Sequence, residues 1–296
     1  MAVDMSPVMA PEGPPPMSLG IEVYVAECHN AFAGICVGMD PRQFDYRAAT
    51  VLVSFSTDAA DRKALWSLRH ALSFSQCSSV VFGDADWPER LQERLKLVDA
   101  EFVNAVVFVG SQNDVVAETV QAAVDTLRGS FGSKLRLLVA ASEATDKLTT
   151  LSGVSGFVRG AQATNGETAQ HVFVALAMLM APKTLNCMDT EDLMPVFGSA
   201  DSPAVLCEAV WLRSGEGPPI FLSGADERAV RGADYLVMTV FAAGLRLSEV
   251  RHVCNSAREV ATSASSFVYF APVNALQSGI HSERVGWALF LCGGIR

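Results

Sequence analysis

The chain has 296 residues, of which 32 are acidic and 22 are basic, so its formal net charge at neutral pH is −10. Half of the residues are apolar and 18% are charged, which is typical of a folded protein with one large or two modest domains. This composition excludes intrinsic disorder, collagen and coiled coil. Without a cluster of Lys or Arg, the acidic balance also argues against nucleic acid and anionic membrane surfaces as partners.

The seven cysteines lie far apart and form no CxxC pair, so we expect reduced thiols in a cytoplasmic protein. No Lys or Arg precedes Arg42, so the N-terminus lacks the basic region of a secretory signal. The longest apolar run, residues 171–181, is half of the ~20 residues that a membrane span needs, which predicts no direct membrane insertion. The five histidines are dispersed without metal-ligand spacing, and we therefore expect no metal site.

The N-terminal half alternates strand and helix patterns. Residues 1–18 are rich in proline and predict a tail without regular structure. From residue 19 to 163 the pattern predicts a Rossmann-like α/β domain with a mostly parallel sheet covered by helices. The expected strands are Ile21–Ala26, Thr50–Ser54, Ser79–Phe82, Ala105–Val109 and Leu135–Ala140, and the expected helices are 61–73, 88–98 and 115–128.

A long apolar helix is predicted next, within residues 164–183, and its wide hydrophobic face suggests a spine between two halves. Residues 184–296 then predict a smaller α+β domain. Its expected helices are 191–197, 204–212 and 247–263, and its expected strands are 236–241, 267–271 and 286–292.

Several motifs resemble those of FtsZ, the bacterial homologue of tubulin. Gly232–Val240 followed by Ala243–Val250 is similar to the strand, glycine turn and "LRLxE" helix start of that family. Ala181-Pro182 and Cys187–Leu193 resemble its proline and its synergy loop, in the same order after the long helix.

Two motifs of the first half agree with this resemblance. Val53–Ala59 looks like the "VNTDA" loop of the family, and Pro88-Glu89 looks like its "NPE" loop. The resemblance implies a tubulin/FtsZ-like fold: a Rossmann-like N-terminal domain, a long central helix and an α+β C-terminal domain.

The glycine-rich loops that hold nucleotide phosphates in the family are missing. Backbone N–H groups approach an anion closely where residues lack a Cβ atom. The sequence has Ala26–Asn30 after the first strand and Gly110–Asp114 where the family has its GGGTGTG signature. Each lost N–H to a charged phosphate costs about 1.5–3 kcal/mol, so GTP is not expected as a cofactor. The resemblance places the degenerate pocket at Glu27, Cys28, His29, Thr57, Asp58, Gly110, Ser111 and Asp114.

Two acidic residues match the synergy loop, Asp189 and Asp192. In FtsZ the corresponding acids promote hydrolysis of the nucleotide that the next subunit holds, so the resemblance makes both residues candidates for catalysis in trans. Their spacing equally suits capping of a helix N-terminus and the helix dipole. Thr57 and Asp58 likewise have an alternative interpretation as turn or cap residues.

The resemblance and the missing loops together predict an FtsZ-like protein that binds no nucleotide and acts by protein–protein contact in bacterial cell division or cytoskeletal organisation. It would join, cap or regulate filaments of an authentic FtsZ, or form its own nucleotide-independent polymer, and would not itself be an enzyme. One alternative is a divergent GTPase that polymerises with GTP. Another is an unrelated α/β protein that binds a small molecule.

Overall fold

The computed structural model describes residues 21–29, 47–55, 76–82, 86–110, 115–142, 151–160, 193–199, 201–212, 220–222, 224–241, 246–270 and 285–295. The first half contains β1 (Ile21–His29), β2 (Arg47–Phe55), β3 (Gln76–Phe82), α2 (Trp87–Lys96), β4 (Phe102–Val109), α3 (Ala117–Phe131), the 3-10 turn η2 (Gly132–Lys134), β5 (Leu135–Ser142) and β6 (Gly156–Gly160). The second half contains the 3-10 turn η5 (Met194–Val196), β7 (Ala204–Leu212), β8 (Ile220–Leu222), α5 (Gly224–Gly232), β9 (Tyr235–Phe241), α6 (Leu247–Val260), β10 (Ser266–Phe270) and β11 (Val285–Gly293).

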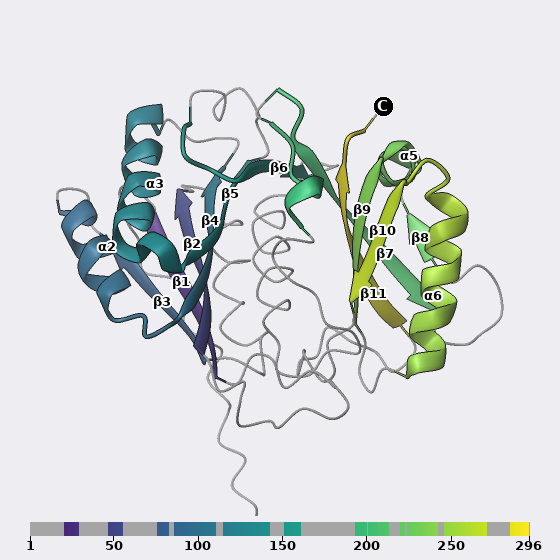
Figure 1. The fold of residues 1–296 in the computed structure, drawn as a ribbon, viewed down its shortest axis with the longest axis horizontal. Helices are drawn as coiled ribbons and strands as arrows, with labels where there is room; N and C mark the ends of the chain where they lie inside the picture. Colours follow the sequence, from purple (N-terminus) through teal and green to yellow (C-terminus); the bar gives the residue numbers. More distant parts are fainter. Residues whose placement is uncertain are drawn as a thin grey trace, which may run out of the picture.

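All of these strands belong to one sheet of 11 strands (Figure 1). The order is β10-β9-β11-β7-β6-β5-β4-β2-β1-β3, with β8 paired to β7. The strands β2, β4, β5, β6 and β7 are parallel neighbours, whereas β1 is antiparallel to β2 and β3, and β11 is antiparallel to β7 and β9. Most strands therefore run in one direction, which confirms the predicted α/β fold with a mostly parallel sheet.

The central strands are apolar because both of their faces are buried. Every residue of β2 after Arg47 is buried, as is every residue of β4 after Phe102. Continuous Val, Leu, Ala and Phe runs are typical of parallel strands covered on both sides. Such burial supplies the main stabilisation of the fold, at about 25 cal/mol for each Å² of apolar surface removed from water.

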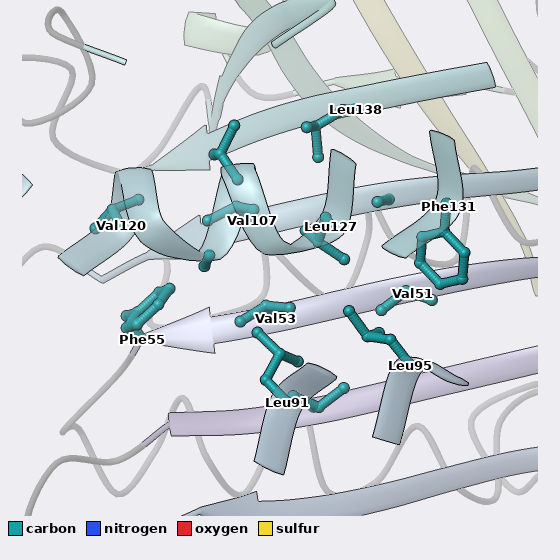
Figure 2. Close-up of a cluster of buried hydrophobic side chains, with 14 of the residues drawn as sticks. Val51, Val53, Phe55, Leu91, Leu95, Val107, Val120, Leu127, Phe131 and Leu138 are labelled. Carbon is teal, nitrogen blue, oxygen red and sulfur yellow. The ribbon is translucent and has the colours of Figure 1, made fainter. Parts of the chain in front are cut away.

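Helices α2 and α3 cover one face of this sheet and form the larger core with it (Figure 2). Leu91 and Leu95 of α2 and Val120 and Leu127 of α3 point towards alternate residues of the strands, including Val53. These helix positions repeat at intervals of three, four or seven residues, so they lie on one helix face, as expected for helices packed on a sheet.

The second core lies on the same face of the same sheet. Phe157 of β6 belongs to the first core, and Arg159, two residues further along that strand, pairs with Val205, which belongs to the second core. Because alternate residues of a strand share a face, α5 and α6 cover the sheet on the side that α2 and α3 cover. In Figure 1 the two helix pairs lie at opposite ends of the sheet, with β6 between them.

Most predicted strands of both halves are confirmed with small shifts of their ends, and α2, α3 and α6 confirm three predicted helices. The predicted helix at 204–212 is wrong, because these residues form strand β7. A short apolar run does not separate a buried helix from a strand buried on both faces, and here pairing with β6, β8 and β11 decides for the strand. The predicted helix at 191–197 is replaced, in its described part, by the 3-10 turn η5.

The predicted helices at 61–73 and 164–183 lie outside the described residues. The domain boundaries stay a prediction, since the described strands of both halves share one sheet. In the part of the chain that the structure describes, no helix has the length and apolarity that crossing a membrane requires.

Candidate functional site

The carboxyl ends of the parallel strands form the candidate site. Strands β2, β4 and β5 end side by side at Phe55, Val109 and Ser142, because Phe55 is in register with Val109 and Val109 with Ser142. Open α/β sheets bind ligands outside this edge, where loops and helix starts converge. We call this region the strand-end edge.

Two helices begin at the strand-end edge. The ring of Trp87, the first residue of α2, packs edge-on against Phe55 with 5.9 Å between ring centroids. The first turn of α3 also lies there, since Val120 is beside Phe55 and Phe131 lies towards the other end of the strands (Figure 2). Neither helix N-terminus has a side-chain cap, and the positive end of each helix dipole is directed towards this edge.

Carboxylates of the chain itself oppose that positive charge. Asp86 precedes α2, and the first turns of α2 and α3 carry Glu89 and Glu118. Arg90 is the basic side chain of the first α2 turns, and its guanidinium lies 3.9 Å from the Asp86 carboxylate. Acidic residues in the first turn stabilise a helix by interacting with its dipole. Because these carboxylates are negatively charged, they also make the strand-end edge unfavourable for a bound, highly charged anion.

Two potential hydrogen-bond donors at this edge already have acceptors. The backbone N–H of Gly110 donates to the carbonyl oxygen of Phe55 at 3.2 Å. The Ser142 hydroxyl, which is fully buried, donates to the carbonyl oxygen of Val109 at 2.8 Å. Gly110 is the glycine that remains of the expected phosphate loop, and its N–H group donates a hydrogen bond within the sheet.

The structure separates Glu27, Cys28 and His29 from Gly110. Because β1 is antiparallel to β2, these residues lie beside Ala49, Ala48 and Arg47 at the start of β2. Gly110 follows the opposite end of the neighbouring strand, beyond Phe55. Phe55 lies six residues along β2 from Ala49, or about 20 Å at ~3.3 Å per residue. Glu27, Cys28 and His29 at the end of β1 are therefore not brought together with Gly110 in one pocket.

The remaining candidate residues are Thr57, Asp58, Ser111, Asp114, Asp189 and Asp192, and they lie outside the described residues. In the sequence, Thr57 and Asp58 come after the end of β2, and Ser111 and Asp114 come after the end of β4. The roles of these six residues stay predictions.

The "LRLxE" motif has a structural role. Glu249 accepts a hydrogen bond from the backbone N–H of Arg246 at 2.8 Å, which satisfies a donor at the start of α6. The expected strand and helix start are confirmed, since β9 ends at Phe241 and α6 begins at Leu247, whereas the glycine turn between them lies outside the described residues.

A group of buried polar residues on the other face of the sheet was not singled out from the sequence. The Tyr24 hydroxyl donates to the Glu22 carboxylate at 2.5 Å, and both residues are buried. Ser54 is the direct cross-strand neighbour of Glu22, and its buried hydroxyl has no hydrogen-bond partner. The spacing of Glu22 and Tyr24 within an apolar strand was the available signal, since residues two apart share a face.

Cys207, Cys254 and Cys292 are free, buried thiols in the second core. The sulfur atoms of Cys207 and Cys292 are 3.9 Å apart on neighbouring strands. The Cys292 contact and burial raise the pKa of the Cys207 thiol, and burial raises the pKa of Cys254 to about 12. Protonated, buried thiols are poor nucleophiles and metal ligands. Within the described ranges, no group of three or more His, Cys, Asp or Glu residues is arranged to hold a metal ion.

No protein-family model matches the chain, and no curated protein matches it significantly. Solved structures of similar arrangement include an empty FtsZ dimer from M. jannaschii, with a TM-score of 0.46 and 13% identity over 79% of this chain and 69% of that chain. CetZ2 from Haloferax volcanii, a GTPγS-bound protofilament, has a TM-score of 0.43 and 12% identity over 72% of this chain and 71% of that chain. TubZ from Bacillus thuringiensis serovar israelensis, a GTPγS-form protofilament, has a TM-score of 0.37 and 11% identity over 71% of this chain and 67% of that chain.

Proposed function

We propose that the chain is a cytoskeletal, FtsZ-like scaffold that binds no nucleotide and acts through protein–protein contacts. Its partner would be an authentic FtsZ filament or further copies of itself. The motif resemblance supports the scaffold, since similar motifs occur in the same order along both halves of the chain. The chemistry of the strand-end edge supports the loss of nucleotide binding.

The charge at the strand-end edge is the observation that carries the proposal. Asp86, Glu89 and Glu118 lie at the starts of the two helices whose N-termini would otherwise attract phosphate. A carboxylate about 4 Å from a phosphate oxygen is repelled by ~1 kcal/mol in water and ~4 kcal/mol at the effective dielectric of a protein surface. Arg90 offsets one of these charges and is already paired with Asp86.

Lost donors add to this repulsion. Gly110 donates its N–H to Phe55, so it is not available to a phosphate without breaking a hydrogen bond of the sheet. Each charge-assisted N–H bond missing from a phosphate site costs about 1.5–3 kcal/mol. Two missing bonds weaken binding by about 10²-fold to 10⁴-fold, which moves a Kd of about 1 μM to about 0.1–10 mM.

Nucleotide binding is tested directly with the purified full chain. A fluorescent GTP analogue is titrated by anisotropy, with FtsZ from the same cell as the positive control. We expect no saturation at concentrations that saturate FtsZ. Micromolar affinity would reject the proposal in favour of a divergent GTPase that polymerises with GTP.

Contact with filaments is tested by co-sedimentation and negative-stain microscopy. The chain is mixed with FtsZ in the presence of GTP, and is also examined alone with and without GTP. We expect it to sediment with FtsZ filaments or to assemble alone regardless of nucleotide. A chain that stays monomeric and leaves FtsZ assembly unchanged contradicts a scaffold role in that cell.

The roles of Asp189 and Asp192 are tested through FtsZ turnover of GTP. If they act in trans, the wild-type chain changes the turnover rate and the Asp189→Ala, Asp192→Ala double variant does not. Asp201→Ala is the matched control, because Asp201 is an exposed acid of the following segment. If FtsZ turns over GTP at the same rate with the wild-type chain and with the double variant, a role in trans is rejected and helix capping is the remaining interpretation of the two acids.

A further inference from the structure

Cys207 and Cys292 form a pair of thiols that the proposed function does not use. Cys207 lies on β7 and Cys292 on β11, and these antiparallel neighbours place Phe290 opposite Cys207. Cys292 is two residues beyond Phe290, so its side chain lies on the same face and diagonally across from Cys207. The two sulfur atoms are 3.9 Å apart, and both thiols are free. The strand pairing therefore holds two free thiols in contact.

The separation of the two sulfur atoms allows a disulfide to form between the strands. Bonded sulfur atoms are ~2.0 Å apart, so the two atoms must approach each other by about 1.9 Å. Rotation about the Cα–Cβ bond of one cysteine moves its sulfur by up to about 3 Å and leaves the backbone in place. The cross-link therefore needs a change of side-chain rotamer and not a change of strand register.

In the closed protein this pair is protected from oxidation. Both side chains are buried, with exposed fractions of 1% for Cys207 and 0% for Cys292. Contact with Cys292, burial and the nearby Asp226 carboxylate raise the pKa of the Cys207 thiol, which therefore stays protonated at neutral pH. Oxidants react with a thiolate rather than with a thiol. Oxidation of the pair therefore requires an opening that admits water and the oxidant.

Helix α5 is the element that we expect to open. It packs on both β7 and β11, and its residues Ala229 and Val230 belong to the same core as the two cysteines. It has nine residues, fewer than the ~12–15 that an isolated helix needs, so its stability depends on this packing. Asp226 in its first turn is buried, and desolvation of a carboxylate opposes the packing. Elements with such weak support open locally while the rest of the protein stays folded.

We propose that Cys207 and Cys292 are a redox-sensitive pair that forms a disulfide when helix α5 opens, with hydrogen peroxide as the oxidant. One thiol loses its proton, and the thiolate attacks a peroxide oxygen. An S–O bond forms, the O–O bond breaks, and the hydroxide that leaves takes up a proton to become water. The second thiolate attacks the sulfur of this sulfenic acid, so that the S–S bond forms and the S–O bond breaks. Hydroxide leaves again and becomes the second water.

This reaction balances and is reversible. The two sulfur atoms together lose two electrons, and the peroxide gains two electrons and two protons as it becomes two water molecules. A small-molecule thiol or dithiol reduces the product by thiol–disulfide exchange. In the oxidised chain a covalent bond joins β7 to β11 between residues that are 85 positions apart in sequence, so the two strands stay together even while α5 is open.

The test exposes the purified full chain to hydrogen peroxide in native buffer. The remaining thiols are then alkylated in denaturant, and a digest made without reductant is read by mass spectrometry. We expect the peptides of Cys207 and Cys292 to be joined, with the loss of two hydrogen atoms, and dithiothreitol to restore both thiols. Cys254 is the internal control: it is buried in the same core but lies on α6, and its peptide should carry the alkyl group. Absence of the joined peptides, or peptides that join Cys254 to either cysteine, would overturn the proposal.

The role of α5 is tested with Ala229→Gly, which lowers the helix propensity of α5. This variant should form the disulfide about fivefold faster than the wild-type chain, because α5 opens more often. Ala123→Gly is the matched control: it makes the same substitution at a buried position of α3 in the first core and should change the rate less than about twofold.

Equal acceleration by Ala229→Gly and Ala123→Gly would mean that the pair oxidises only when the whole protein unfolds, which overturns the proposal. An unchanged rate for Ala229→Gly also overturns it. If Ala229→Gly does not fold, the joined peptides of the wild-type chain in native buffer still test the pair. No step involves nucleotide or filament contact, so these outcomes are independent of the proposed function.

Discussion

Phe55 joins the core to the strand-end edge, and its truncation tests how the edge is built. The side chain is fully buried at the end of β2 and packs edge-on against Trp87 at the start of α2. Truncating a buried Phe to Ala costs about 3–5 kcal/mol, which includes the cavity that remains. The lost aromatic pair accounts for ~0.5–1.5 kcal/mol of this cost.

We therefore expect Phe55→Ala to lower the free energy of unfolding by about 3–5 kcal/mol, and a loss of this size should be measured as a lower urea midpoint at unchanged slope. Leu97→Ala is the control, since the Leu97 side chain is 69% exposed and should cost less than about 0.5 kcal/mol. If Phe55→Ala costs less than about 1 kcal/mol, Phe55 does not pack as described and the placement of α2 at the strand-end edge loses its support.

Further predictions concern backbone approach and thiol ionisation. Gly293→Ala would place a Cβ atom 2.2 Å from the carbonyl oxygen of Val196 and should destabilise the protein by about 1–3 kcal/mol in urea unfolding, whereas Gly129→Ala in α3, where nothing lies within 4 Å, should stabilise it by ~0.5–1 kcal/mol. Equal effects of the two substitutions would contradict the packing of η5 on β11. Burial raises the pKa of Cys254 from 9.0 to about 12, so the folded state holds this proton more tightly than the unfolded state. Its contribution to stability is complete below pH 9 and should be lost as pH rises towards 12, by up to ~1.4 kcal/mol per pH unit. Cys254→Ala should flatten the decline of thermal stability over that range, and an unchanged slope would contradict burial of this thiol.

Much of the fold could be predicted from patterns along the chain. Val- and Leu-rich runs identified β2, β4 and β5, because strands buried on both faces carry few polar residues, here including Thr50, Ser54 and Asn104. Apolar residues at helical spacing identified α2, α3 and α6. The pattern was insufficient at β7, where a helix was predicted, since a nine-residue run that is apolar except for Glu208 suits either a buried helix or a central strand.

Prediction of the site was limited by the direction of one strand. The sequence shows Glu27 and His29 after a strand and Gly110 after another, and parallel strands would bring both to one edge. Pairing of β1 with β2 and β3 is antiparallel, which places Glu27 at the opposite edge. Strand direction depends on hydrogen bonds between segments far apart in sequence, so local pattern carries little information about it.

Residue composition and apolar spacing by themselves determined that the chain forms an α/β protein and that its net charge is acidic. Those properties are local, because they depend on which side chains follow one another. Only the tertiary structure decided that Asp86, Glu89 and Glu118 lie near the strand ends, that the Gly110 N–H donates to the Phe55 carbonyl oxygen, and that Arg90 and Arg94 contact strand β3. These are relations between distant segments, set by strand order and by the face on which each helix packs.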